Sequence, residues 1–401
     1  MHRPSSLSQL QALVAQARPR DGIRVVGAGH SFNDLASSSG CQVSLAGLPP
    51  EVSVDQAARQ ARVAAGLSYA EVDGRLDEAG FALRNLASLP HITVAGATAT
   101  ATHGSGAANQ NLAAAVAGLR MVTADGDVVD LRRGDDGFEG AVVHLGALGV
   151  VVSLTLDLVP SFDISQRVYE DLPLAVLDDH FAGLMTGGYS VSLFTDWRAP
   201  RLTQVWIKQR PGPPITPGSW FTATPAPAQR HPVPGGSPEA CTQQLGVPGR
   251  WYDRLPHFRA EFRPSIGDEL QSEYLLPVAH AVPALHALGR IRDQLAPVLR
   301  ICEIRVVAAD QLWLSPCYRQ DSVAFHFTWF RDLARVLPAA ALIESQLAPF
   351  GARPHWGKVF TTPPEELRDH YERLPDFLRL MDHYDPAGKF RNAFIARYLG
   401  G

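Results

Sequence analysis

Cysteine is scarce in this sequence of 401 residues. The four cysteines, Cys41, Cys241, Cys302 and Cys317, lie far apart and form no C-x-x-C pair. This spacing excludes a disulfide-rich scaffold and a zinc ribbon, because both need closely spaced cysteines. Dispersed thiols are typical of a reducing compartment, so we expect a cytoplasmic protein.

Long apolar runs and a surplus of basic charge are also missing. No stretch of about 18 uncharged apolar residues occurs, and the first residues, MHRPSSLSQLQALVAQA, lack the apolar core of a signal peptide. The 36 basic and 40 acidic residues leave a net charge of −4. We therefore expect neither a membrane nor a nucleic-acid partner. The length suits two domains rather than one.

Two common catalytic signatures are absent. The histidines, which include His91, His103, His326 and His355, show no H-x-x-x-H or H-E-x-x-H spacing, so we expect no catalytic metal. The G-x-S-x-G turn that would present a serine nucleophile is missing as well.

The pattern of apolar residues predicts a mixture of helices and strands. Helices are expected at 5–18, 69–80, 279–297 and 338–348, strands at 23–26, 41–66, 146–160, 189–197, 203–209 and 269–277, a hairpin at 120–131, and loops at 90–106 and 209–250. Strands and helices do not alternate regularly, so the pattern does not fit a doubly wound sheet.

Residues 23–34, IRVVGAGHSFND, begin like the strand and glycine loop of a dinucleotide site. The usual fingerprint is Gly-x-Gly-x-x-Gly at the start of a helix. Gly27 and Gly29 fit it, but Phe32 stands where the third glycine would be. The glycines are compatible with an ordinary tight turn or with a backbone that approaches a pyrophosphate.

A second segment of small residues, VAGATATATHGSG (94–106), carries hydroxyls at Thr98, Thr100, Thr102 and Ser105. It can be a packed threonine-rich turn or a backbone that lies against a large flat ligand. Because two such segments occur in one domain, binding of a ligand is favoured over a packed turn.

Three apolar segments in the C-terminal half each carry two polar residues at positions i and i+2, which share one face of a strand. The pairs are Gln271 and Glu273, Glu303 and Arg305, and His326 and Thr328. A surface strand would show the same pattern. Because CEIRVVA and VAFHFTW are otherwise strongly apolar, we expect the polar floor of a buried sheet that lines a pocket.

The segment RPHWGKVF (353–360) places His355, Trp356 and Lys358 beside Gly357. Lys358 can be an ordinary surface residue or a fixed positive charge held near a cofactor.

Seven stretches taken together resemble the bacterial alditol oxidases, within the vanillyl-alcohol-oxidase-type flavoprotein family. They are GAGHSFND, SLPHITVAGATATATHGSG, LGALGVV, CEIRVVAADQLWLSP, HFTWF, RPHWGKVF and DPAGKFRNAFIARYLG, in matching order along essentially the whole chain. The resemblance implies an α+β fold of two domains. A PCMH-type FAD-binding domain is expected at 1–162, an inserted substrate domain with an antiparallel sheet flanked by helices at 163–354, and a segment that returns to the FAD domain at 355–401.

The resemblance also implies how FAD is held. The histidine of Gly-x-Gly-His-Ser is joined in this family to the 8α carbon of the flavin, and His30 matches it. The other cofactor-binding residues that it implies are Val26, Gly27, Ala28, Gly29, Ser31, Phe32, Ser88, Thr93, Gly96, Ala97, Thr98, Ala99, Thr100, Thr102, His103, Gly104, Gly149, Val150, Val151 and His355.

The residues implied for substrate are those of the polar strands and their neighbours. The substrate-binding set is Ser88, Gln271, Glu303, Arg305, Thr328 and Lys358, and the catalytic set is Glu303, Arg305, His326 and Lys358. Glu303 would accept and Arg305 and Lys358 would donate hydrogen bonds, with His326 as a candidate to help remove the hydroxyl proton.

The implied activity is oxidation of the terminal hydroxyl of xylitol, sorbitol and similar alditols to the aldose. Hydride would pass to flavin N5, and O2 would be reduced to H2O2. An aldonolactone oxidase or dehydrogenase of the same fold is the alternative, and a flavin-free sugar-binding protein is a more remote one. Family members of this type are usually monomers. They carry a short segment before the first helix, and its absence here is expected to leave an open sheet edge.

Overall fold

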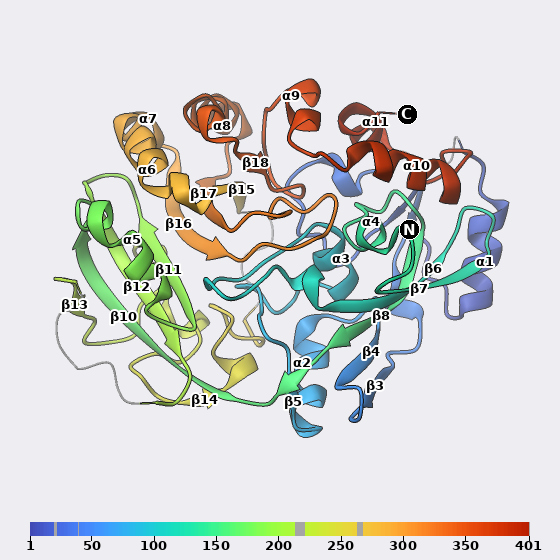
Figure 1. The fold of residues 1–401 in the computed structure, drawn as a ribbon, viewed down its shortest axis with the longest axis horizontal. Helices are drawn as coiled ribbons and strands as arrows, with labels where there is room; N and C mark the ends of the chain where they lie inside the picture. The colour runs from blue at the N-terminus through green and yellow to red at the C-terminus, as the bar shows by residue number, and fades with distance from the viewer. Residues whose placement is uncertain (20–21, 39, 213–220, 263–267, 401) are drawn as a thin grey trace.

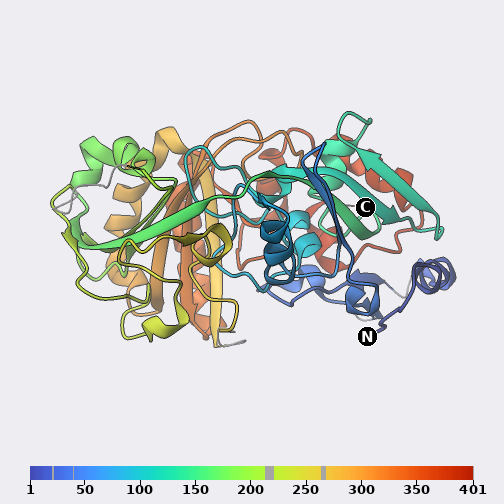
Figure 2. The same ribbon diagram turned by 90° about the horizontal axis from the view of Figure 1, so that it is seen from below.

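The computed structural model describes residues 1–19, 22–38, 40–212, 221–262 and 268–400. They form two lobes, and both chain termini lie in the first lobe (Figures 1 and 2). The chain builds most of the first lobe, enters the second along β10 (Asp163–Pro173), and returns after β18 (Arg353–Pro354).

The first lobe is built around a five-stranded antiparallel sheet in the order β3-β4-β8-β6-β7, with β1 and β2 as a separate parallel pair. Its elements are α1 (Leu7–Gln16), β1 (Ile23–Val25), η2 (Asp34–Ala36), β2 (Cys41–Val43), η3 (Leu45–Gly47), β3 (Val52–Asp55), β4 (Gln60–Ala64), α2 (Tyr69–Glu78), β5 (Phe81–Ala82), α3 (Val94–Ala99), η4 (Leu112–Ala115), β6 (Val116–Val122), β7 (Val128–Arg132), α4 (Phe138–Val142), β8 (Val150–Asp157) and β9 (Val159–Pro160). After the second lobe, α9 (Pro364–Asp369), α10 (Leu374–Tyr384) and α11 (Ala393–Tyr398) pack back onto this lobe, where α10 contacts α4 and α11 contacts η2.

The second lobe contains an antiparallel sheet of nine strands within the described ranges, in the order β13-β10-β12-β11-β16-β17-β15-β18, with β14 paired to β10. Its other elements are α5 (Val176–Thr186), β11 (Ser190–Thr195), β12 (Arg201–Gln209), β13 (Thr224–Pro225), η5 (Pro238–Ala240), β14 (Gly249–Arg250), η6 (Trp251–Asp253), β15 (Glu269–Pro277), η7 (Val278–His280), α6 (Ala281–Arg290), α7 (Arg292–Leu295), β16 (Leu299–Val307), β17 (Ser322–Phe330), α8 (Leu333–Leu347) and η8 (Ala348–Phe350). Helices α5, α6 and α8 lie in a row on one side of the sheet, and the first lobe lies on the other side (Figure 2).

Most of the expected elements are confirmed. The helices at 5–18 and 69–80 are α1 and α2, the hairpin at 120–131 is β6–β7, and the long strands of the second lobe are β11, β12 and β15. Their ends follow ordinary capping chemistry: the Ser6 side chain accepts from Gln9 N at the start of α1, and Ser68 with Glu71 forms a capping box on α2.

Several expectations were wrong. The loop expected at 90–106 contains α3, a six-residue helix whose Ala, Gly and Thr composition gives no apolar periodicity. Helix α8 begins at Leu333, where Asp332 caps it, and runs through Pro338. Residues 41–66, where a strand, a turn and a second strand were expected, form three strands, and a break at Ile291 divides 279–297 into α6 and α7. The loop at 209–250 is irregular except for short elements, and its residues 213–220 lie outside the described residues.

Arg24 on β1 joins distant parts of the first lobe. Its Nη1 donates to Gly146 O and Phe390 O, both at 3.0 Å, and its Nη2 donates to Leu35 O and Leu145 O, both at 2.7 Å. Burial lowers the pKa of Arg24 to about 10, so the guanidinium remains charged at neutral pH.

Replacing Arg24 by methionine is expected to lower the free energy of unfolding by about 3–5 kcal/mol, because four carbonyls would lose their donors. Urea unfolding followed by circular dichroism measures the change. Arg120→Met is the control, since Arg120 pairs with Asp130 on the exposed face of the β6–β7 hairpin and should contribute less than about 1 kcal/mol. Equal unfolding midpoints for Arg24→Met and the unmodified protein would contradict this account.

Candidate active site

A cavity of about 980 Å³ lies between the two lobes. From the first lobe it is lined by residues in the ranges 24–36, 87–103 and 144–151, and from the second lobe by β15, β16 and β17. Residues 355–358, which follow β18 where the chain leaves the second lobe, line it as well. Its volume is at the upper end of the range of about 300–1,000 Å³ that small-molecule and cofactor sites occupy. The cavity therefore has room for a large ligand held by both lobes.

Five of the six polar residues on β15, β16 and β17 lie in two rows across the sheet, and the sixth, Arg305, is opposite Ala324. Glu303 is opposite His326, which is opposite Glu273. In the next row Thr328 is opposite Gln271. Residues paired in this way, or two apart on one strand, project from the same face. The sheet therefore presents all five side chains to the cavity.

The Glu273 carboxylate is the centre of this polar face. Arg305 Nη2 donates to its Oε1 at 2.5 Å and Lys358 Nζ donates to its Oε2 at 2.6 Å. His103 Nε2 and His326 Nδ1 lie 3.3 and 3.7 Å from the same carboxylate. Burial by itself would raise the pKa of Glu273, but the charges of Lys358 and Arg305 hold it well below its usual value. Glu273 is therefore a buried anion that fixes two buried cations.

Lys358 determines the tautomer of His326. An ammonium group can only donate, so His326 Nδ1, at 2.6 Å from Lys358 Nζ, accepts. His326 Nε2 then carries the proton and donates to Thr328 Oγ1 at 3.2 Å. Burial and the charge of Lys358 lower the pKa of His326 to about 4, so the ring is neutral at neutral pH. Burial also lowers the pKa of Lys358, and Glu273 opposes this shift.

Arg305 and Glu303 keep unused hydrogen-bonding capacity. Arg305 Nε is buried without a hydrogen-bond partner among the described residues and lies 3.7 Å from Glu303 Oε1. Glu303 Oε1 accepts from His257 Nε2 at 2.8 Å, and no described residue donates to Glu303 Oε2. Burial would raise the pKa of Glu303, but Arg305 and His257 hold it far below its usual value.

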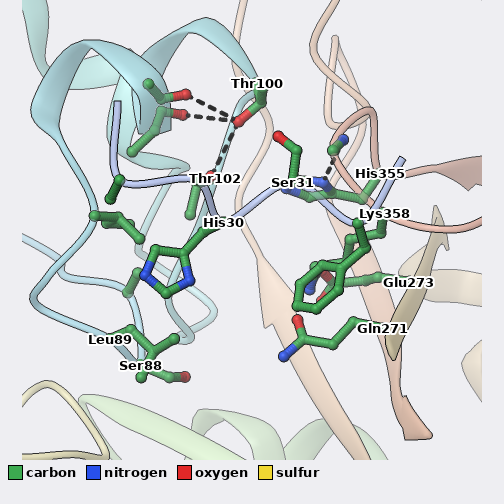
Figure 3. Close-up of a pocket in the computed structure, with 18 of the residues that line it drawn as sticks. His30, Ser31, Ser88, Leu89, Thr100, Thr102, Gln271, Glu273, His355 and Lys358 are labelled. Atoms are coloured by element: carbon green, nitrogen blue, oxygen red, sulfur yellow. Dashed lines mark hydrogen bonds and ion pairs between the residues drawn. The ribbon is translucent and has the colours of Figure 1, made fainter. Parts of the chain in front are cut away.

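The first lobe faces this array with His30 and small residues. Figure 3 shows the His30 ring between Thr102 above it and Leu89 and Ser88 below it, with Gln271, Glu273 and Lys358 on the opposite side of the view. Burial lowers the pKa of His30, with His91 contributing, so the imidazole is neutral.

The glycine loop is tied to residues 356–358, which follow β18. Phe32 N donates to Gly357 O at 2.8 Å, and Asn33 Nδ2 donates to the carbonyls of Trp356 and Lys358. The loop that carries His30 and the segment that carries Lys358 are therefore held together.

The residues present fit FAD. Gly29 has a φ of 72°, and a Cβ there would meet nothing within 4 Å, so its backbone is open to the cavity. A Cβ at Gly27 or Gly96 would lie 2.2 or 2.8 Å from Thr93 Oγ1, so both positions need glycine for the two loops to approach. Small residues at one end and a charged face at the other suit a dinucleotide whose reactive ring lies near the charges.

The cavity brings together most of the residues expected at the site. Those that line it are Val26, Gly27, Ala28, Gly29, His30, Ser31, Phe32, Ser88, Thr93, Gly96, Ala97, Ala99, Thr100, Thr102, His103, Gly149, Val151, Gln271, Glu303, Arg305, His326, Thr328, His355 and Lys358.

Three expected cofactor residues do not line the cavity. Thr98 turns its hydroxyl to the carbonyls of Val94 and Ala95. Val150 is fully buried, because Gly149 and Val151 take the cavity side. Gly104 packs against the backbone of Leu86, where a Cβ would lie 2.2 Å from the carbonyl oxygen. A contact with a ligand in this cavity is not supported for these three.

Sequence reasoning missed the role of Glu273 and all of the contacts behind Glu303. The alternation on β15 had indicated that Glu273 shares a face with Gln271, but not that it is the common partner of Arg305 and Lys358. His257 lies in a segment without periodicity, so only the fold places it beside Glu303.

Metal-binding clusters and membrane-spanning helices are absent from the described residues. They contain no group of three or more histidine, cysteine or acidic side chains arranged to hold a metal ion. None of their helices is both long and apolar enough to cross a membrane.

Comparison with known proteins agrees with this site. Residues 1–132 match the family described as FAD binding domain, and residues 268–398 match D-arabinono-1,4-lactone oxidase. An alditol oxidase from Streptomyces sp. is 52% identical over 100% of this chain and 96% of its own length. An L-gulono-1,4-lactone dehydrogenase from Mycobacterium tuberculosis is 30% identical over 99% of this chain and 95% of its own length.

The fold is shared with a cholesterol oxidase from B. sterolicum, with a TM-score of 0.80 over 99% of this chain and 93% of the other at 14% identity. This likeness confirms the expected α+β architecture of an FAD-binding domain with an inserted substrate domain. The chain therefore belongs to the alditol oxidases, FAD-dependent oxidoreductases of the vanillyl-alcohol-oxidase type.

Proposed function

We propose that this protein oxidises the terminal hydroxyl of alditols such as xylitol and sorbitol to the aldehyde, with O2 as the final electron acceptor. The observation that carries the proposal is the buried array of Glu303, Arg305 and Lys358 around Glu273, facing the same cavity as His30. FAD, when bound, supplies the redox chemistry by accepting hydride and reducing O2 to H2O2.

His30 is the proposed site of covalent FAD attachment, through a bond from the imidazole to the flavin 8α carbon. A neutral imidazole is required for this bond, and the burial that lowers the pKa of His30 provides it. Bond formation removes two protons and two electrons from the histidine and the flavin methyl group, and O2 is the oxidant that takes them up.

The charged array matches a neutral ligand covered in hydroxyl groups. Lys358 uses two of its three N–H donors, on Glu273 and His326, and keeps one for a ligand. Arg305 Nη1 makes no hydrogen bond with a described residue, and Glu303 Oε2 can accept. Arg305 and Lys358 would stabilise negative charge that develops on the substrate oxygen as hydride leaves.

His326 is better suited to positioning than to proton removal. Its Nε2 carries a proton that is donated to Thr328, and its Nδ1 accepts from Lys358. To take a proton from substrate it would have to lose the bond from Lys358. We therefore assign to His326 the orientation of Lys358 and Thr328.

The remaining expected residues complete the proposed site. Ser88 enters from the first lobe, and its carbonyl accepts from the backbone N–H groups of His257 and Phe258 at 3.0 and 3.2 Å. Gln271 lies beside Thr328, and His355 has a pKa well below its usual value because of burial and the charge of Lys358. The domain bounds at residues 162 and 354, a monomeric state and a cytoplasmic location stay predictions of the sequence.

A lactone oxidase or dehydrogenase is the second candidate, because the lactone oxidase family matches residues 268–398. The identity of 52% to an alditol oxidase, against 30% to a lactone dehydrogenase, favours a polyol over a lactone as the substrate.

A substrate panel tests the proposal. The purified protein, xylitol, sorbitol and L-gulono-1,4-lactone are mixed in air, and H2O2 is followed with peroxidase. We expect peroxide with the polyols and little with the lactone. Peroxide with the lactone alone would reverse the assignment, and oxidation of no polyol would refute it.

A further inference from the structure

A second buried polar chain leads from Glu303 through His257, which also lines the cavity, to Lys208 in the interior of the second lobe. Lys208 Nζ, on β12, is 3.0 Å from His257 Nδ1 and 3.2 Å from Pro256 O, and it also donates to Leu255 O. His257 Nε2 in turn donates to Glu303 Oε1 at 2.8 Å. The residues Lys208, His257 and Glu303 thus form a continuous chain from the interior of the second lobe to the cavity.

The chemistry of the three partners fixes the direction of the hydrogen bonds. Burial lowers the pKa of Lys208 to about 7, and Glu303 opposes this shift. Below that pH Lys208 is an ammonium group with three donors and no acceptor, and it has three acceptors in reach. His257 Nδ1 must therefore accept, which puts the single proton of the neutral ring on Nε2. That proton is the one donated to Glu303.

The surroundings keep His257 neutral and in place. Its ring packs edge-on against Trp206 and Phe194, at centroid distances of 5.0 and 5.8 Å. Burial and then the charge of Lys208 lower the pKa of His257 to about 4, against the opposing effect of Glu303. Arg305, on the same strand as Glu303, also lowers it.

We propose that Lys208 and His257 are positioning residues that hold the Glu303 carboxylate for polyol binding, with Lys208 selecting the His257 tautomer that donates to Glu303. His257 occupies Oε1, so Oε2 stays available for a substrate hydroxyl. In many enzyme sites one ring nitrogen of a histidine makes the functional contact, and a hydrogen bond to the other ring nitrogen orients the ring and sets its tautomer. This inference rests on the proposed polyol oxidation.

Two substitutions of His257 separate positioning from packing. Glutamine can accept from Lys208 with its amide oxygen and donate to Glu303 with its amide nitrogen, whereas leucine can do neither. We expect His257→Leu to raise the KM for xylitol about 10- to 100-fold with a smaller change in kcat, and His257→Gln to recover most of the loss. Flavin content and circular dichroism verify that both variants fold.

A second buried lysine provides the matched control. Lys389 Nζ also donates to three carbonyls, those of Val14, Ala15 and Ala124, but it does not line the cavity. Lys208→Met should raise the KM for xylitol, and Lys389→Met should lower the unfolding temperature and leave KM unchanged. Equal KM values for the leucine and glutamine variants, or for Lys208→Met and Lys389→Met, would overturn the proposal.

An independent measurement needs no turnover. In the ¹⁵N spectrum of histidine-labelled holoenzyme, the His257 ring, identified by its loss in His257→Gln, should be neutral and protonated at Nε2. A ring protonated at Nδ1 or at both nitrogens would contradict the proposed chain, even if no polyol were oxidised. If the unmodified protein oxidised no polyol but His257 showed the expected tautomer, the proposed function would be refuted and the hydrogen-bonded chain would stand.

Discussion

Replacing Glu273 by glutamine is expected to lower kcat/KM for xylitol by about 100- to 1,000-fold. The change leaves Arg305 and Lys358 in a buried site without the carboxylate that both contact at 2.5–2.6 Å. Loss of one partner from a buried, hydrogen-bonded charge pair costs about 2–5 kcal/mol in binding, and part of that is the penalty of the unpaired charges. Steady-state peroxide formation measures the effect.

The same substitution should change the pH dependence. Burial lowers the pKa of Lys358, and Glu273 raises it back in part. Without Glu273 the pKa of Lys358 falls further, so the ammonium is lost at lower pH as pH rises. The decline of kcat/KM on the alkaline side should therefore begin at lower pH in Glu273→Gln than in the unmodified protein.

Glu170→Gln is the matched control, since Glu170 on β10 is a glutamate of the same lobe that does not line the cavity. Its side chain is partly exposed and lies 2.7 Å from Arg230, so the ion pair should contribute less than about 1 kcal/mol. If both glutamine variants lose the same activity while retaining flavin and fold, Glu273 is not the organising charge of the site.

His30→Ala is expected to abolish covalent retention of the flavin completely. When the unmodified protein is precipitated with acid, the yellow colour should stay with the pellet, because a covalent bond survives unfolding. In His30→Ala the colour should move to the supernatant or be absent. The absorption spectrum of both fractions measures the distribution.

His91→Ala is the control for this result. His91 is a neighbouring histidine that influences the pKa of His30, but its ring contacts Phe262 O rather than the cavity. The pellet of this variant should remain yellow. Colour in the supernatant of the unmodified protein would exclude a covalent bond between His30 and the flavin, and the family assignment would be unaffected.

The sequence predicted well what depends on local periodicity. Alternation on β15, β16 and β17 predicts the shared face of Gln271, Glu303 and Thr328, because residue pairing in a sheet preserves side-chain direction. The resemblance to known flavoproteins added the position of His30, which no periodicity could indicate.

The parts that the sequence did not predict depend on packing between distant segments. Glu273 becomes a common partner only when residues 103, 305 and 358 converge on it, and His257 meets Glu303 across 46 positions of sequence. Helix α3 was missed because Gly and Thr offset the helix propensity of Ala and a segment of six residues is too short to form a stable helix alone, so tertiary contacts decide its conformation.

Anaerobic mixing of the purified yellow protein with xylitol tests the central claim most directly. We expect xylitol to bleach the visible flavin absorption in the absence of O2, and admission of air to restore it with release of H2O2. Flavin that is bleached by L-gulono-1,4-lactone but not by xylitol, sorbitol or any other polyol would contradict the claim.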